Sequence, residues 1–106
     1  MGFLIGQTTG KIKGTIKDSE TNEALIGANV IVQGTYLGAA TDVDGAYYIL
    51  NIKPGTYTLV IDMIGYKQVK MENVRVSVNR TSNIDVDLVP TVIQGETVFV
   101  EVERSE

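Results

Sequence analysis

The chain contains no cysteine and no histidine, and it has only two prolines among its 106 residues. Without cysteine it forms neither a disulfide framework nor a thiolate site. Without histidine it lacks the usual base of a nucleophilic triad, and the two absences together remove the nitrogen and sulfur ligands of an ordinary zinc site. We therefore predict no catalytic residues, no cofactor and no enzyme activity.

Basic side chains are also in the minority. The chain carries nine Lys and Arg against thirteen Asp and Glu, a formal net charge of −4, and the basic residues gather in no dense block. Because nucleic-acid affinity rests largely on basic clusters, we expect no nucleic-acid partner. No apolar run approaches the roughly 20 residues that a membrane helix needs, so we do not expect the chain to span a membrane.

Short alternating runs are what the sequence has instead. Turn signals at Asp44-Gly45 and Pro54-Gly55 are each followed by apolar and aromatic residues. Asp and Gly favour turns, and Pro-Gly suits the central positions of a type II turn. Alternation or β-branched content typical of half-buried strands occurs over residues 11–17, 27–32, 39–42, 45–50, 57–63, 66–71, 74–78 and 83–88. With no convincing helical period, the pattern predicts an all-β sandwich.

Tyrosines offer one candidate binding surface. Tyr57 and Tyr66 lie at core-like positions of the alternation, so we assign them to packing. Tyr36 and Tyr48 are the two expected to be exposed, and they form a candidate platform for sugar rings. The simpler alternative is that these side chains bind nothing.

Two acidic pairs need a separate interpretation. Asp42 and Asp44 with Gly45 resemble a fragment of a calcium loop, but the further oxygen ligands and the closing glutamate are missing. We favour a hairpin loop in which an aspartate caps the turn, so no metal site is predicted. Asp85 and Asp87 share one face of a strand about 6.5–7 Å apart, where we interpret them as solvated charges and not as an acid–base pair.

Three stretches resemble a known family. Residues 13–30 resemble the G-x-V-x-D … x-P-L-x-G-A-x-V opening of carboxypeptidase regulatory-like domains, 38–47 their T-D-x-D-G-x-F/Y hairpin, and 53–66 their P-P-G-x-Y-x-L … x-G-Y segment. Ala24 and Lys53 stand where the family usually has proline. The resemblance implies a seven-stranded antiparallel Greek-key β-sandwich of the transthyretin-like (prealbumin-like, Ig-like) kind over residues 10–90.

The tail, residues 91–106, indicates which host protein carries the domain. Its Gln94–Arg104 stretch resembles the L-x-E-V-V-V-T-A-x-R segment that follows this domain in TonB-dependent outer-membrane receptors of the SusC type. That segment includes the Ton box and leads toward the receptor plug; Glu101 departs from its usual small residue. The resemblance implies a periplasmic N-terminal domain that couples nutrient uptake to a protein partner. The alternative is a structural or adhesive module of a peptidase or cell-surface protein. Residues 1–9 fit the remnant of a secretion leader or an artefact of cloning.

The tail also alternates, with three valines opposite phenylalanine and glutamate. We predict a strand with no obvious partner inside the domain, which binds the C-terminal domain of a TonB-like protein by β-augmentation. Its partner-binding residues are Glu96, Val98, Phe99, Val100 and Val102. Because unpaired strands recruit other chains, we also predict a strand-exchanged homodimer through the tail.

Overall fold

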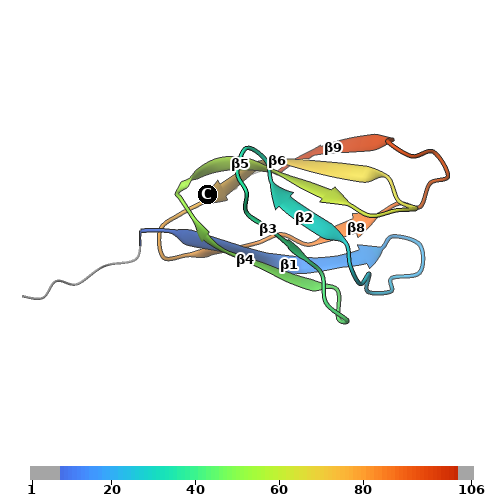
Figure 1. The fold of residues 1–106 in the computed structure, drawn as a ribbon, viewed down its shortest axis with the longest axis horizontal. Coiled ribbons are helices and arrows are strands. Elements are labelled where there is room, and N and C mark those ends of the chain that lie inside the picture. The colour runs from blue at the N-terminus through green and yellow to red at the C-terminus, as the bar shows by residue number, and fades with distance from the viewer. Residues whose placement is uncertain (1–7, 103–106) are drawn as a thin grey trace, which may run out of the picture.

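A computed structural model describes residues 8–102, and within them the chain is all-β (Figure 1). The predicted β-sandwich is therefore confirmed. Most of the predicted leader, residues 1–7, lies outside the described residues. The strands are β1 (Gly10–Asp18), β2 (Asn29–Val32), β3 (Gly38–Ala40), β4 (Ala46–Ile52), β5 (Gly55–Asp62), β6 (Gln68–Val76), β7 (Thr81–Asn83), β8 (Val86–Leu88) and β9 (Thr97–Glu101).

The strands form two layers. One sheet has the order β4-β1-β7, with β8 also paired to β1, and the other has the order β3-β2-β5-β6-β9. The resemblance implied seven antiparallel strands. The structure instead has nine among the described residues, and β7, β8 and β9 run parallel to their neighbours. Runs 66–71 and 74–78 are essentially one strand, β6, because the chain bulges opposite Tyr57–Leu59 without leaving β5.

The core lies between the layers and follows the predicted alternation. Tyr47 and Ile49 of β4 are buried, whereas Tyr48 and Leu50 are exposed. On β5, Leu59 and Ile61 are fully buried, as period-two alternation requires. The largest fully buried side chains are Tyr47, Ile12, Ile16, Ile49, Ile52, Leu59, Ile61, Leu88, Val30, Val32, Val74 and Val76. All of them lie between Ile12 and Leu88, so the tail contributes none of the largest fully buried side chains.

The run 83–88 is not one continuous strand. It breaks between β7 and β8, where Asp85 Oδ1 accepts hydrogen bonds from the amide and hydroxyl of Thr15 at 2.9 and 3.2 Å. Asp85 and Asp87 are both exposed, which agrees with their interpretation as solvated charges, but the additional hydrogen bonds of Asp85 to Thr15 were not predicted. The Asp85 side chain replaces a backbone acceptor at the break, which lets the chain bend while β1 keeps its hydrogen bonds.

No helix among residues 8–102 has the length and apolar character needed to cross a membrane.

Candidate partner-binding strand

The tail has a partner inside the domain, contrary to the prediction. β9 runs parallel to β6, with Val69 opposite Val98, Lys70 opposite Phe99 and Met71 opposite Val100. In Figure 1 it forms the outer margin of the five-stranded sheet. Period-two alternation identifies a strand but says nothing about which edge accepts it, so the sequence could not reveal this pairing.

The two faces of β9 have different environments. Val98 and Val102 pack against the core, and Val100 is 39% exposed. On the solvent face, Phe99 is 62% exposed, and its ring centroid lies 5.7 Å from Nζ of Lys70. An exposed cation–π contact of this kind contributes about 0.5–1 kcal/mol. The alternation of the tail therefore directs Val98 and Val102 toward the core and Phe99 toward solvent.

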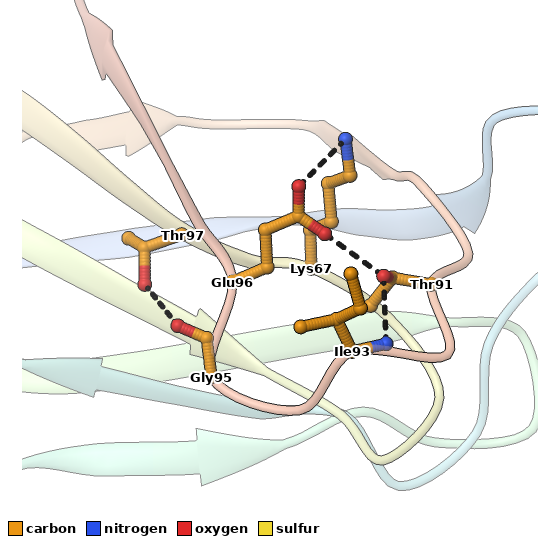
Figure 2. Close-up of polar contacts among 6 residues, drawn as sticks. All are labelled: Lys67, Thr91, Ile93, Gly95, Glu96 and Thr97. Carbon is orange, nitrogen blue, oxygen red and sulfur yellow. Dashed lines mark hydrogen bonds and ion pairs between the residues drawn. The ribbon is translucent and has the colours of Figure 1, made fainter.

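Polar contacts fix the start of β9 (Figure 2). The Glu96 carboxylate accepts a hydrogen bond from the Thr91 hydroxyl at 2.9 Å and lies 3.4 Å from Nζ of Lys67. The Glu96 carbonyl accepts the Gln68 amide at 2.8 Å. Figure 2 also shows Thr97 Oγ1 donating to the carbonyl of Gly95 at 3.2 Å. Glu96, predicted to bind a partner, therefore anchors the tail within its own chain.

The end of β9 is also held. The amide of Val102 donates to the carbonyl of Glu72 at 2.9 Å, and the Asn73 side chain donates to the Glu101 carboxylate. Thr91, at the root of the tail, donates its amide to the carbonyl of Gly65 at 2.9 Å. The strand is thus attached at its root, start and end.

The outer edge of β9 is the part that remains available. In a parallel ladder, alternate residues of a strand bond to the neighbour and the others point away. Because the Glu96 carbonyl and the Val102 amide face β6, the even-numbered residues bond to β6. Thr97, Phe99 and Glu101 then direct their backbone N–H and C=O groups outward, and within residues 8–102 no strand pairs with that edge. This arrangement is a short template for an added strand.

The two exposed tyrosines do not form one platform. Tyr36 lies in the turn between β2 and β3 and is fully exposed, whereas Tyr48 lies on β4 of the other sheet. Tyr48 borders a shallow groove of about 270 Å³ lined also by Lys13, Asn83 and Asp85. The predicted exposure of both tyrosines is confirmed. A sugar ring bound at Tyr48 would contact the side chains of this groove and not Tyr36.

The Asp42–Gly45 hairpin matches the favoured interpretation. Asp42 Oδ1 accepts the amides of Asp44 and Ala46, both at 2.9 Å, so Asp42 caps the turn. Oδ1 of Asp42 is therefore already occupied by hydrogen bonds from two backbone amides. No group of three or more candidate metal ligands occurs in the part of the chain that the structure describes.

Sequence reasoning missed one polar contact at the root of the tail. The buried carboxylate of Asp18 accepts hydrogen bonds from the Tyr66 hydroxyl at 2.7 Å and from the amides of Glu20 and Thr21 at 2.7 and 3.0 Å. The Tyr66 hydrogen bond is the main cause of a lowered Asp18 pKa, and the same bond raises the Tyr66 pKa. Tyr66 was assigned to packing from its core-like position in the alternation, and a hydrogen bond across 48 residues leaves no local signal in the sequence.

Comparisons with known proteins agree with this architecture. The sequence profile of the CarboxypepD_reg-like domain matches residues 12–100. The chain belongs to this family. The matched stretch includes most of β9, so the family resemblance extends beyond the sandwich core into the tail.

Relatives in this family come from two kinds of protein. Human carboxypeptidase D is 36% identical over 81 residues, 76% of this chain and 6% of that protein. The TonB-dependent receptor SusC of Bacteroides thetaiotaomicron is 46% identical over 56 residues, 53% of this chain and 5% of the receptor. The TonB-dependent receptor P3 of Formosa agariphila is 29% identical over an alignment covering 99% of this chain and 14% of the receptor. The chain thus spans a small fraction of each relative.

A solved structure shows the same fold at low identity. A chain of a type II cohesin–X-dockerin complex from Acetivibrio cellulolyticus superposes with a TM-score of 0.65 and 24% identity, covering 76% of this chain and 56% of that one. At this identity the likeness supports the β-sandwich architecture alone.

Proposed function

We propose that the chain is a non-catalytic N-terminal domain of a TonB-dependent outer-membrane receptor, located at the periplasmic face of that membrane, and that β9 is the strand its partner binds. The similarity to two TonB-dependent receptors, one across nearly the whole chain, supports this host. The observation that carries the proposal is the open outer edge of a strand whose sequence resembles the Ton box.

The geometry suits coupling better than catalysis. In β-augmentation, backbone groups of the two strands supply the affinity, and alternate side chains supply the specificity. β9 offers the outward backbone groups of Thr97, Phe99 and Glu101, and it follows directly from the sandwich through residues 89–96. A pull on a strand bound in this way would be transmitted to the root of the tail at Thr91.

A binding titration tests the proposal. The labelled full chain is titrated with the purified C-terminal domain of a Bacteroides TonB protein, alongside a Val98→Pro/Phe99→Pro variant. Because each proline removes one N–H, the variant loses one donor on each edge of β9. We expect binding to weaken at least about tenfold, or about 1.4 kcal/mol.

The matched control is Val78→Pro. Val78 lies in the Ser77–Arg80 turn, before the positive-φ residue Asn79, where proline fits the second turn position. This variant should bind like the parent chain. Equal affinity of the parent and the β9 variant, or no binding by the parent, would reject the proposal.

The second candidate is a structural or adhesive module of a cell-surface protein or peptidase that contacts glycans. The groove beside Tyr48 favours it, since an exposed ring there lies next to charged and amide side chains. A glycan-array screen of the parent and of Tyr48→Ala tests it. Hits that disappear in the variant would support this function, and an array without hits would count against it.

A further inference from the structure

We infer that the partner strand adds to the outer edge of β9 while β9 stays paired with β6, so that the sandwich and the tail together form the docking surface. This inference rests on the proposed function and specifies how the partner engages the same strand. The alternative is that β9 leaves β6 and binds the partner as a free peptide.

Release of β9 would disrupt many contacts. Five register pairs join it to β6, and Val98 and Val102 would lose their packing against the core. The Lys67–Glu96 ion pair and the Asn73–Glu101 hydrogen bond would be broken. Release would also uncover the β6 edge, which would then carry unpaired backbone groups. Addition at the outer edge disrupts none of these contacts.

The outer edge of β9 is also the least protected edge of the sandwich. Edge strands are usually protected by shortness, proline, lysine or bulges. β3 and β7 have three residues each, and β4 is interrupted by a register shift at its end, where Asn51 has a φ of 62°. β9 is five residues long, with an unbroken register and neither proline nor lysine. It is therefore the edge best suited to accept a strand.

Side chains beside this edge define the chemistry of the partner. Phe99 is 62% exposed beside this edge, so an apolar side chain on the added strand could pack against its ring. Glu72 and Glu101 are direct register neighbours, and like charges placed opposite each other repel. The best partner is therefore an extended edge strand with an apolar residue beside Phe99 and a Lys or Arg near the Glu72–Glu101 pair.

A covalent pin tests whether β9 must leave. Met71 and Val100 are register partners on adjacent strands, and the chain has no cysteine of its own. A Met71→Cys/Val100→Cys variant would therefore form a single disulfide that holds β9 on β6. We expect its oxidised and reduced forms to bind the same TonB C-terminal domain with affinities equal within about threefold.

The outcomes separate this inference from the proposed function. If only the reduced form binds, β9 must leave β6, so the inference is wrong and the proposed function stands. If neither form binds and the parent chain also fails, the proposed function is wrong.

Hydrogen exchange on the parent complex gives a second measurement that needs no disulfide. The amides of Gln68 and Val102 bond across the β6–β9 pair, so they should stay protected on binding. Those of Phe99 and Glu101 should become protected. Loss of protection at Gln68 and Val102 on binding would overturn the inference.

Discussion

The Tyr66 hydroxyl donates a 2.7 Å hydrogen bond to Oδ2 of Asp18, joining the end of β1 to the loop between β5 and β6. The same loop holds the root of the tail, because Tyr66 bridges Pro90 and the carbonyl of Gly65 accepts the Thr91 amide. The contact therefore supports the place from which β9 starts.

Acid should weaken this contact. The Tyr66 hydroxyl, and then the amides of Thr21 and Glu20, lower the pKa of Asp18 in the folded protein. A lowered folded-state pKa means that the contact stabilises the fold fully above the unfolded-state pKa. This stabilisation is lost as the pH falls through the folded-state value. Tyr66→Phe should raise the Asp18 pKa, and its urea midpoint should vary less with pH across that acidic range.

Carboxyl NMR titration of Asp18 and urea denaturation at several pH values check this prediction. Tyr36→Phe is the matched control, because Tyr36 is fully exposed in the β2–β3 turn. An Asp18 pKa that is the same in the parent and in Tyr66→Phe would contradict the assigned cause.

Gly14 should tolerate no side chain. A Cβ at this position would lie 1.7 Å from the carbonyl oxygen of Ile84, at the break between β7 and β8. Because the clash is with backbone, Gly14→Ala should lower the free energy of unfolding by about 3 kcal/mol, the upper part of the range for overpacking. Gly34→Ala is the control: it has open space but a φ of +87°, so it should cost about 1–2 kcal/mol. Urea denaturation of both variants tests this, and equal losses would contradict it.

Local patterns in the sequence predicted much of the fold. Alternation identified the buried faces of β4 and β5, and turn chemistry identified the hairpin capped by Asp42. Neither the β6–β9 pairing nor the Asp18–Tyr66 bond could be predicted in this way, since each joins segments far apart in the sequence. The break at Asp85 was missed because its side chain replaces a backbone acceptor, and alternation does not detect this substitution.

Amide exchange in the free chain should alternate along β9. The Val102 amide bonds to the carbonyl of Glu72, and the parallel register gives Val98 and Val100 the same direction toward β6. Their exchange should be slowed relative to Phe99 and Glu101, whose amides point outward. NMR-detected hydrogen exchange measures this directly. Uniformly fast exchange over residues 97–102 would show that β9 is not held on β6 in solution.

Removal of the tail should increase self-association. A chain ended after Pro90 keeps every fully buried side chain but uncovers the edge of β6, which is nine residues long. Sedimentation velocity over a range of concentrations should show more dimer for this shortened chain than for the full chain. Identical monomers would mean that β9 does not protect β6.

A homodimer of the full chain stays a prediction. Because β9 is paired within its own chain, the predicted strand exchange would require β9 to leave β6, whereas a dimer formed without exchange would use the outer edge of β9. Phe99→Lys, which places a charge beside that edge, should then reduce it.

The acidic pair at the end of β9 should make partner binding depend on salt. Glu72 and Glu101 are register neighbours, and the Asn73 side chain donates a hydrogen bond to the Glu101 carboxylate. This amide is neutral, so the two negative charges still repel each other. A partner cation near the pair would relieve their repulsion, and added salt would screen this attraction, since the Debye length falls from about 10 Å at 0.1 M to about 3 Å at 1 M. Glu72→Gln/Glu101→Gln should therefore weaken binding several-fold at low salt and flatten its salt dependence.

The matched control for that variant is Glu20→Gln/Glu23→Gln, which also removes two negative charges, at exposed positions in the β1–β2 connection outside β9. Titrations of the parent and both variants against the same TonB C-terminal domain, at about 0.05 M and 0.5 M salt, compare the slopes. An unchanged slope in the double variant would place the partner's charge elsewhere. A slope reduced equally by Glu20→Gln/Glu23→Gln would mean that the net charge of the chain, and not the pair beside β9, attracts the partner.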